Sequence, residues 1–111
     1  MILFGISNCD TVKKARAYLD QAQRPYHFHD FRKDGLSAEH IQAWLLTVPY
    51  VDLINKRSTT WKQLDENQRQ AIEQQDLVLL CQHPTLIKRP VLQTTDRTLA
   101  GFKPADYDKL R

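Results

Sequence analysis

The pattern of apolar positions changes its period near the start of the chain. Residues 1–6 form a nearly continuous apolar run, which is typical of a strand covered on both faces. From residue 11 onward, apolar residues recur at helical spacing with charged residues between them. These positions are Val12, Ala15, Leu19 and Ala22. The pattern therefore predicts a strand followed by a helix.

A second strand and a helical insertion are expected next. Residues 26–31 have the aromatic-rich composition of a strand, after a break at residues 23–25. A strand, a helix and a strand in this order predict a parallel pair with a right-handed crossover. Ser37 has the place of an N-cap before further helical periodicity, so residues 37–83 are expected to form a helical insertion.

The remaining segments complete the expected order. Within the insertion we expect a helix over 37–49, a short helix or turn over 50–55, a loop over 56–61, a helix over 66–75 capped by Asp65, and a helical turn over 77–83. After it we expect a loop and strand over 86–92, a hairpin turn over 94–97, a strand over 98–102 and a helix from 104 to 110. The order is β-α-β, helical insertion, β-β-α, an α/β fold in a single domain over residues 1–111.

Composition limits the classes of protein that fit. The chain has 111 residues, a net charge of +3 and 41% hydrophobic residues, with no apolar run long enough for a membrane span. Its first residues lack the basic start and cleavage site of a signal peptide. Two cysteines without an export signal favour a reducing cytoplasm. We expect a soluble cytoplasmic protein, monomeric, with small anionic partners rather than membrane or nucleic acid.

Cys9 is the leading candidate for chemistry because it lies where the first helix begins. The first N–H groups of a helix have no intrahelical partner and its dipole favours negative charge, so a thiolate is stabilised there. Lys13, Lys14 and Arg16 are expected to add positive field. The alternative is a small buried cysteine without chemistry.

The second cysteine and the histidines are less informative. Cys81 lies in an apolar run, which raises the pKa of a thiol and leaves it inert, so we expect it in the core. The alternative is a resolving cysteine for Cys9. His27 and His29 share one strand face, but no further ligand follows at metal-site spacing, so a half-exposed face is favoured and no metal is expected.

Two motifs and the order of elements resemble the ArsC-type arsenate reductase family, including its Spx-like and YffB-like members. The motifs are Gly-Ile-Ser-Asn-Cys-Asp-Thr-Val-Lys-Lys-Ala-Arg at 5–16 and Leu-Ile-Lys-Arg-Pro-Val at 86–91. The likeness covers essentially the whole chain. It looks closest to the YffB branch, whose Asn-Lys-Arg-x-Thr-Thr-Trp segment is similar to residues 55–61. The resemblance implies a thioredoxin-like fold with a helical insertion.

The resemblance also implies a set of site residues. Cys9 matches the nucleophile, and Arg89 matches an oxyanion-binding arginine. Lys103, in Phe-Lys-Pro, stands where those enzymes carry Cys-Arg-Pro or similar; lysine keeps the charge but loses the planar fork. Pro90 occupies the place of the cis proline of thioredoxin-like folds, the alternative being an ordinary trans proline that opens a strand. The remaining anion binders implied are Arg57, Lys13 and Asn8.

At two positions the sequence lacks a residue that a related mechanism requires, which reduces the number of mechanisms that fit. Val12 replaces the second cysteine of the Cys-x-x-Cys switch common in Spx-like regulators, and Ala15 replaces the arginine that phosphatase-like arsenate reductases need. A single thiol requires a second thiol from outside, most simply glutathione, through a mixed disulfide at Cys9. We expect a glutathione-dependent thiol oxidoreductase, served by glutaredoxin in the arsenate reaction, that acts on arsenate or on a glutathionylated or disulfide substrate, with no resident cofactor. The alternatives are an Spx-like adaptor that binds RNA polymerase without catalysis, and a degenerate member with neither activity.

Overall fold

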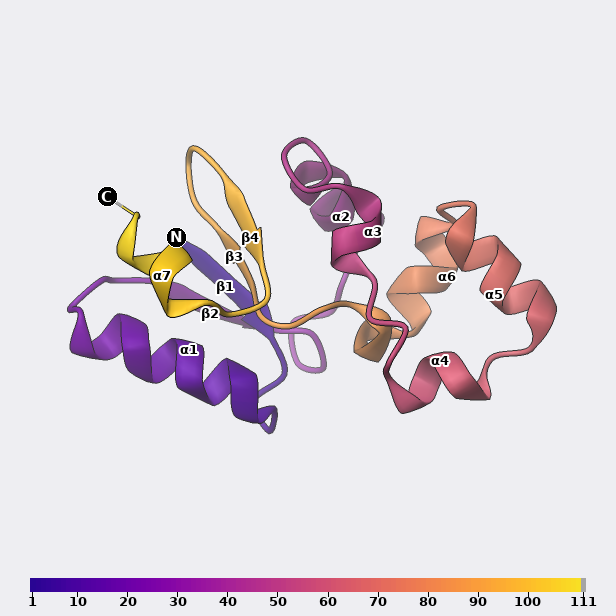
Figure 1. The fold of residues 1–111 in the computed structure, drawn as a ribbon, viewed down its shortest axis with the longest axis horizontal. Coiled ribbons are helices and arrows are strands. Elements are labelled where there is room, and N and C mark those ends of the chain that lie inside the picture. The colour runs from indigo at the N-terminus through magenta and orange to yellow at the C-terminus, as the bar shows by residue number, and fades with distance from the viewer. Residues whose placement is uncertain (111) are drawn as a thin grey trace. The chain divides into compact units, whose positions relative to one another are not determined.

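The computed structural model describes residues 1–110, which form two units (Figure 1). Within the described residues, the sheet unit consists of residues 1–35 and 89–110. The helical unit is Leu36–Lys88, and it contains the segment expected to be a helical insertion. The chain therefore leaves the sheet unit once and returns to it once.

The sheet unit has four strands and two helices. In chain order they are β1 (Ile2–Gly5), α1 (Asp10–Gln21), β2 (His27–Asp30), β3 (Val91–Gln93), β4 (Thr98–Ala100) and α7 (Pro104–Asp108). The strand order is β2-β1-β3-β4, with β1 and β2 parallel and the other two neighbouring pairs antiparallel. The parallel pair is the one that α1 connects, as a crossover requires. The predicted β-α-β and β-β-α order is confirmed.

One face of this sheet is covered by α1 and α7. Strand, helix and terminal residues share one buried cluster, which consists of Leu3, Ala15, Leu19, Leu92, Tyr107 and Leu110. Burying a leucine side chain contributes about 1.5–3 kcal/mol, so this cluster fixes α1 firmly against the strands. Phe4, the next residue after Leu3, faces the other side, where its ring centroid lies 4.8 Å from that of His29.

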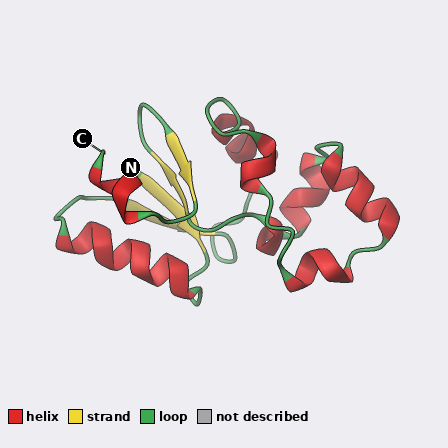
Figure 2. Ribbon diagram, viewed as in Figure 1, coloured by secondary structure: helices red, strands yellow, loops and turns green. Residues whose placement is uncertain are grey.

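The helical unit is a set of short helices joined by loops, as Figure 2 shows for residues 36–88. They are α2 (Ala38–Trp44), α3 (Tyr50–Leu53), α4 (Thr59–Gln63), α5 (Glu66–Glu73), α6 (Leu77–Gln82) and the 3₁₀ helix η1 (Pro84–Leu86). Four of them begin at a side chain that accepts a backbone N–H bond, as N-caps do. The caps are Ser37, Ser58, Asp65 and Asp76. The predicted caps at Ser37 and Asp65 are confirmed.

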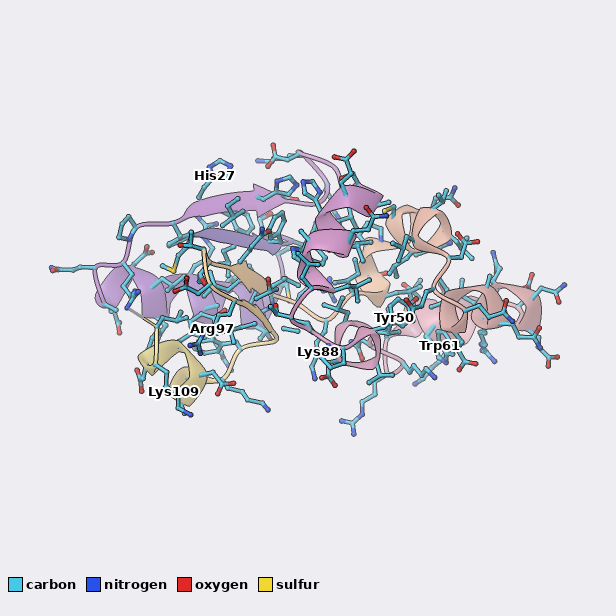
Figure 3. All side chains as sticks on the ribbon, turned by 90° about the horizontal axis from the view of Figure 1, so that it is seen from above. His27, Tyr50, Trp61, Lys88, Arg97 and Lys109 are labelled. Atoms are coloured by element: carbon cyan, nitrogen blue, oxygen red, sulfur yellow. The ribbon has the colours of Figure 1, made fainter. Side chains whose placement is uncertain are left out.

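The expected loop over residues 56–61 is wrong in its second half, because α4 begins at Thr59. The Oγ of Ser58 accepts the N–H of Trp61 at 3.2 Å. The Trp61 ring, labelled in Figure 3, then lies within 5.2 Å of the Lys56 ammonium and 5.8 Å of the Arg69 guanidinium. These contacts stabilise α4 although its first two residues are threonines, whose branched side chains do not favour a helix. Two other expected helices are shorter than predicted, with α2 ending at Trp44 and α5 at Glu73.

The helical unit has its own core. Its fully buried side chains include Ile41, Trp44, Leu53, Ile72, Leu80 and Leu86. They come from α2, α3, α5, α6 and η1, so each of these helices contributes to the same interior. Throughout residues 1–110, every helix is too short or too polar to cross a membrane.

Candidate active site

Four segments of the sheet unit meet at the carboxyl end of β1. Gly5, the last residue of β1, pairs with Asp30, the last of β2. Because Phe4 pairs with Val91, the start of β3 lies at the same end of the sheet. The N–H of Gly101, just after β4, donates to the carbonyl oxygen of Pro90 at 2.8 Å. The loop after β1, the segment before β3 and the segment after β4 therefore share one sheet edge.

Cys9 occupies the N-cap position of α1 at this edge. Its backbone is extended, with φ −92° and ψ 126°, and its carbonyl accepts the N–H of Lys13 at 3.0 Å. Its own N–H donates to the carbonyl of Ile6 at 3.1 Å, which closes a tight turn. Within the described chain no side chain caps this end of α1. The half-buried thiol therefore belongs to a helix end whose first N–H groups are open to a thiolate or an anion.

Arg89 and Lys103 enter the same edge from the other two segments. Arg89 is half buried and directly precedes Pro90, and the peptide bond between them is cis, as the resemblance implies. Lys103 is exposed at the N-cap position of α7. Its neighbour Phe102 packs edge-on against Tyr107, with ring centroids 4.8 Å apart. The sheet thus brings two cationic segments to the end where Cys9 lies.

The basic residues of α1 divide into two groups. Lys13 and Lys14 are exposed near the start of the helix. Arg16 is engaged elsewhere, because its Nε donates to the Tyr26 hydroxyl at 3.2 Å and its guanidinium lies 4.3 Å from the centroid of the Phe28 ring. Arg16 therefore packs α1 against the segment that contains Tyr26 and Phe28.

Polar residues flank Cys9 directly on both sides. Asn8 is exposed in the turn, as an anion-binding role requires. Asp10, also exposed, supplies an acidic side chain to the first turn of α1. A carboxylate at this position interacts favourably with the helix dipole but repels a neighbouring thiolate. It therefore offsets part of the stabilisation expected from Lys13 and Lys14.

Arg57 belongs to the helical unit. It is exposed, and its backbone N–H donates to the Asn55 side-chain oxygen at 3.1 Å. Its neighbour Lys56 is paired with Glu73 at 2.7 Å. The motif around Arg57 is thus held by its neighbours, while the role of the guanidinium in an anion site stays a prediction.

Asp30 was not singled out by the sequence, although it lies at the site's edge. Its side chain is buried, with 5% of the residue exposed. Burial by itself raises the pKa of this carboxyl, but hydrogen-bond donors beside it, with the Arg32 N–H at 2.8 Å from Oδ1 among them, outweigh burial and lower the pKa. The signal available in the sequence was its position, because the carboxyl ends of parallel strands meet at one edge.

Cys81 is half buried on α6, not in the core as predicted. The apolar run around it does not lie wholly inside, since Val78 is 67% exposed. Partial burial still raises the pKa of the Cys81 thiol, which agrees with the inert behaviour expected of it.

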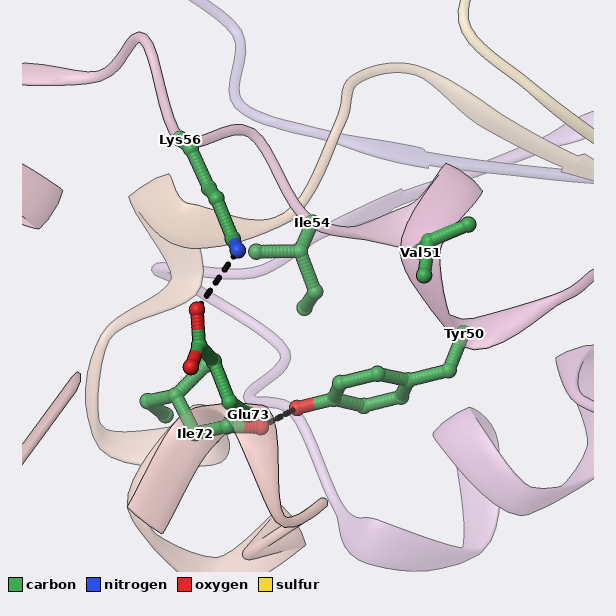
Figure 4. A pocket seen from close by; sticks show the side chains of 6 residues that line it. All are labelled: Tyr50, Val51, Ile54, Lys56, Ile72 and Glu73. Atoms are coloured by element: carbon green, nitrogen blue, oxygen red, sulfur yellow. Dashed lines mark hydrogen bonds and ion pairs between the residues drawn. The ribbon is translucent and has the colours of Figure 1, made fainter. Parts of the chain in front are cut away.

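A cavity of about 400 Å³ lies within the helical unit (Figure 4). It is lined by Tyr50, Val51, Ile54, Lys56, Ile72 and Glu73. The Tyr50 hydroxyl donates to the carbonyl of Ile72, and Lys56 is paired with Glu73, so these polar groups already have partners. Neither cysteine lines it, and in residues 1–110 no three potential metal ligands lie together. The sheet edge at Cys9 is therefore the better candidate for chemistry.

Comparison with known proteins gives a consistent result. The ArsC family model matches residues 4–110. A solved structure of a protein named YFFB is 41% identical, with a TM-score of 0.89 over 96% of this chain and 95% of that one. An arsenate reductase (ArsC) related protein from Brucella melitensis is also 41% identical, with a TM-score of 0.73 over 98% and 94%. More distantly, the global transcriptional regulator Spx of Bacillus subtilis is 29% identical over 103 residues, 90% of this chain and 78% of that protein.

Proposed function

The chain belongs to the ArsC family, and from that membership we propose that it is a glutathione-dependent thiol oxidoreductase with Cys9 as its nucleophile. The observation that carries the proposal is the position of Cys9, at an uncapped helix start on the sheet edge that Arg89 and Lys103 also reach. A thiolate there is stabilised by the helix, and the cations attract an anionic substrate.

The reaction needs two thiol exchanges. The Cys9 thiolate attacks the glutathione sulfur of a mixed disulfide, forming a Cys9–glutathione disulfide and releasing the other thiol as a thiolate, which takes up a proton. A free glutathione thiolate then attacks the glutathione sulfur on Cys9. Oxidised glutathione forms and Cys9 leaves as a thiolate. The net reaction converts one mixed disulfide and one glutathione thiol into the released thiol and one molecule of oxidised glutathione.

Arsenate is the second substrate class. Its reduction to arsenite takes two electrons from two thiols and releases one oxygen as water, with glutathione supplying the thiols and glutaredoxin resolving the mixed disulfide. Arg89 and Lys103, with Lys13 and Asn8, would hold the oxyanion or the carboxylates of glutathione. We favour the disulfide substrate, because lysine at position 103 lacks the bidentate fork that suits a tetrahedral oxyanion.

A mechanism with one protein thiol is supported by two features. Val12, three residues after Cys9, is fully buried, so position 12 is a packing position. The pKa of Cys81 is raised by burial, which disfavours its thiolate as a resolving nucleophile. The second thiol is therefore supplied from outside.

Mass spectrometry after incubation with oxidised glutathione tests the proposal. One glutathionyl group on Cys9 is expected in the native protein and in Cys81→Ser, and none in Cys9→Ser. Turnover of a glutathione mixed disulfide, followed by NADPH oxidation through glutathione reductase, should disappear in Cys9→Ser alone. A wild-type protein that takes up no glutathionyl group, or takes it up equally on both cysteines, contradicts the proposal.

The relationship to Spx favours one other candidate, an adaptor that binds RNA polymerase without catalysis. A pull-down with purified RNA polymerase core enzyme would support this function if wild type and Cys9→Ser retain the polymerase equally. If the same preparation also shows no turnover with glutathione, the adaptor function would be favoured over the oxidoreductase function.

A further inference from the structure

We infer that Phe102 is a positioning residue, which fixes the backbone of Lys103 and so keeps a positive charge near the Cys9 thiol. The inference rests on the proposed function, in which Lys103 attracts an anionic substrate to Cys9. It adds to that function the group that determines where this charge lies. It also gives a property of the substrate, because a fixed cation beside the thiol favours anionic disulfides over neutral ones.

The ring of Phe102 is held by two tyrosines that come from different helices. Its centroid lies 4.8 Å from that of Tyr107 in α7 and 5.8 Å from that of Tyr18 in α1. The centroids of the two tyrosine rings are 5.9 Å apart, so each of the three rings packs against the other two. All three pairs are edge-to-face, an arrangement that aromatic rings prefer. Phe102 therefore joins the segment after β4 to both helices.

The backbone on both sides of Phe102 is fixed as well. Gly101 has a φ of 79°, which lets the chain turn after β4, and its N–H donates to the Pro90 carbonyl at 2.8 Å. The Lys103 carbonyl accepts the N–H of Tyr107 at 3.2 Å. Residues 101–103 are thus bonded to the segment before β3 at one end and to α7 at the other. The Phe102 ring adds the contact with α1, the helix that begins at the nucleophile.

Lys103 depends on these contacts because its own side chain is exposed and contributes little packing. An exposed lysine samples many rotamers, so the position of its backbone determines the region in which its ammonium moves. An ammonium attracts an anion over about 8–10 Å at ordinary ionic strength, so it acts on a substrate at Cys9 without touching the sulfur. Displacement of the segment would therefore weaken the attraction although the charge is still present.

The test compares two alkylating reagents on Cys9 in a Cys81→Ser background, in which Cys9 is the one remaining cysteine. In both reactions the thiolate displaces iodide from carbon, but iodoacetate is an anion and iodoacetamide is neutral. We define the charge ratio as the second-order rate constant for iodoacetate divided by that for iodoacetamide, at pH 7 and low salt. The thiolate fraction cancels in this ratio, so a substitution that only loosens the fold leaves it unchanged, while a displaced cation lowers it.

Four variants separate the charge from the ring that positions it. They are Lys103→Met, Phe102→Ala, Phe102→Tyr and the double variant Phe102→Ala with Lys103→Met. Lys109→Met is the matched control, because Lys109, labelled in Figure 3, is an exposed cation at the other end of α7. Circular dichroism establishes that each variant is folded.

We expect Lys103→Met to lower the charge ratio about threefold and Phe102→Ala to lower it about twofold. Phe102→Tyr, which keeps the ring, and Lys109→Met should give the ratio of the parent. In the double variant the ratio should equal that of Lys103→Met, because no charge remains to be displaced.

A folded Phe102→Ala variant with the parent ratio would overturn the inference, as would an equal effect of Phe102→Ala with and without Lys103. A parent ratio in Lys103→Met would also overturn it. If Phe102→Ala does not fold, Tyr18→Leu removes a ring contact of Phe102 from the α1 side, and a parent ratio in that variant overturns the inference. Failure of the parent protein to take up glutathione refutes the proposed function but leaves the charge ratios, which need no glutathione, intact.

Discussion

Val12 packs so closely against Gly5 that a Cβ atom on Gly5 would lie 2.7 Å from Cγ2 of Val12. Both residues are buried, Gly5 at the end of β1 and Val12 in the first turn of α1. Gly5 and Val12 lie on either side of the loop that carries Cys9. Their contact therefore sets how near the start of the helix lies to the end of the strand.

Gly5→Ala should destabilise the protein by about 1–3 kcal/mol, the usual cost of overpacking a tight core contact. It should also slow Cys9 alkylation, because the start of α1 must move. Urea unfolding measures the first effect. Adding Val12→Ala to Gly5→Ala makes room for the new Cβ, so the double variant should be more stable than the sum of the two single changes predicts. Simple additivity would show that the contact is not the cause.

Arg89→Lys keeps the positive charge but loses the planar fork, so it should cost roughly 1.5–3 kcal/mol in kcat/KM for the glutathione-linked reaction, the range for a charged hydrogen bond. Lys88→Ala removes an exposed cation one residue earlier, labelled in Figure 3, and should change kcat/KM less than twofold. Equal effects of the two substitutions would remove Arg89 from the site.

Lys103→Arg separates the two substrate classes. If the site serves arsenate, restoring the arginine should raise arsenate turnover about tenfold, near 1.4 kcal/mol for one improved charge-assisted bond. Our preference for a disulfide substrate predicts that turnover stays near background in both proteins. The assay is arsenate-dependent NADPH oxidation coupled through glutathione, glutathione reductase and glutaredoxin. Robust arsenate turnover by the wild-type protein would reverse the preference.

Asp30 should make the stability of the protein depend on pH in the acid range. Burial raises the pKa of its carboxyl, but hydrogen-bond donors beside it, the Arg32 N–H among them, lower the pKa below the unfolded value of about 3.9. The folded state therefore binds this proton less readily than the unfolded state. The resulting stabilisation is complete above about pH 5 and is lost as the pH falls through the folded pKa.

Urea unfolding of wild type and Asp30→Asn from pH 7 to pH 2.5 checks the direction. The stability difference between the two proteins should be constant near neutrality and should shrink below about pH 4. A difference that grows toward acid pH would mean that the pKa of Asp30 is raised by folding.

Tyr107→Phe should stabilise the protein. Tyr107 is 1% exposed in the apolar cluster under α7, and in the described structure its hydroxyl has no hydrogen-bond partner. A buried unpaired polar group costs about 1–3 kcal/mol, so its removal should raise the free energy of unfolding by roughly 1 kcal/mol. Tyr26→Phe is the matched control: its hydroxyl accepts a bond from Arg16, and its loss should lower stability by about 0.5–1.5 kcal/mol. The same sign for both variants would contradict this interpretation.

The sequence predicted the sheet unit well because its signals are local. The apolar run of β1, the period of α1 and the turn after β3 each lie within one short stretch, and the position of Cys9 follows from the first two. Helix α4 was missed for a local reason as well. Thr59 and Thr60 weaken the helical signal, although Ser58 three residues before Trp61 has the spacing of an N-cap.

The missing part of the site is non-local. Asp30 is brought to the end of β1 by the pairing of β2 with β1, a register that the residues next to Asp30 do not encode. The helical pattern places Arg16 among the basic residues of α1, but it does not show that the side chain contacts Tyr26 and Phe28, residues from another strand segment. Charge patterns locate cations along a helix, but only tertiary packing decides which of them remain free.

Both tryptophans of the chain, Trp44 in a buried core and Trp61 beside two cations, belong to the helical unit, while Cys9 and the sheet belong to the other. Intrinsic tryptophan emission is therefore an optical label for residues 36–88 that requires no engineering. The sheet unit can be followed in the same sample by Cys9 alkylation when Cys81 is replaced by serine. The chain thus carries separate reporters by which the unfolding of its inserted segment can be distinguished from that of the fold around the nucleophile.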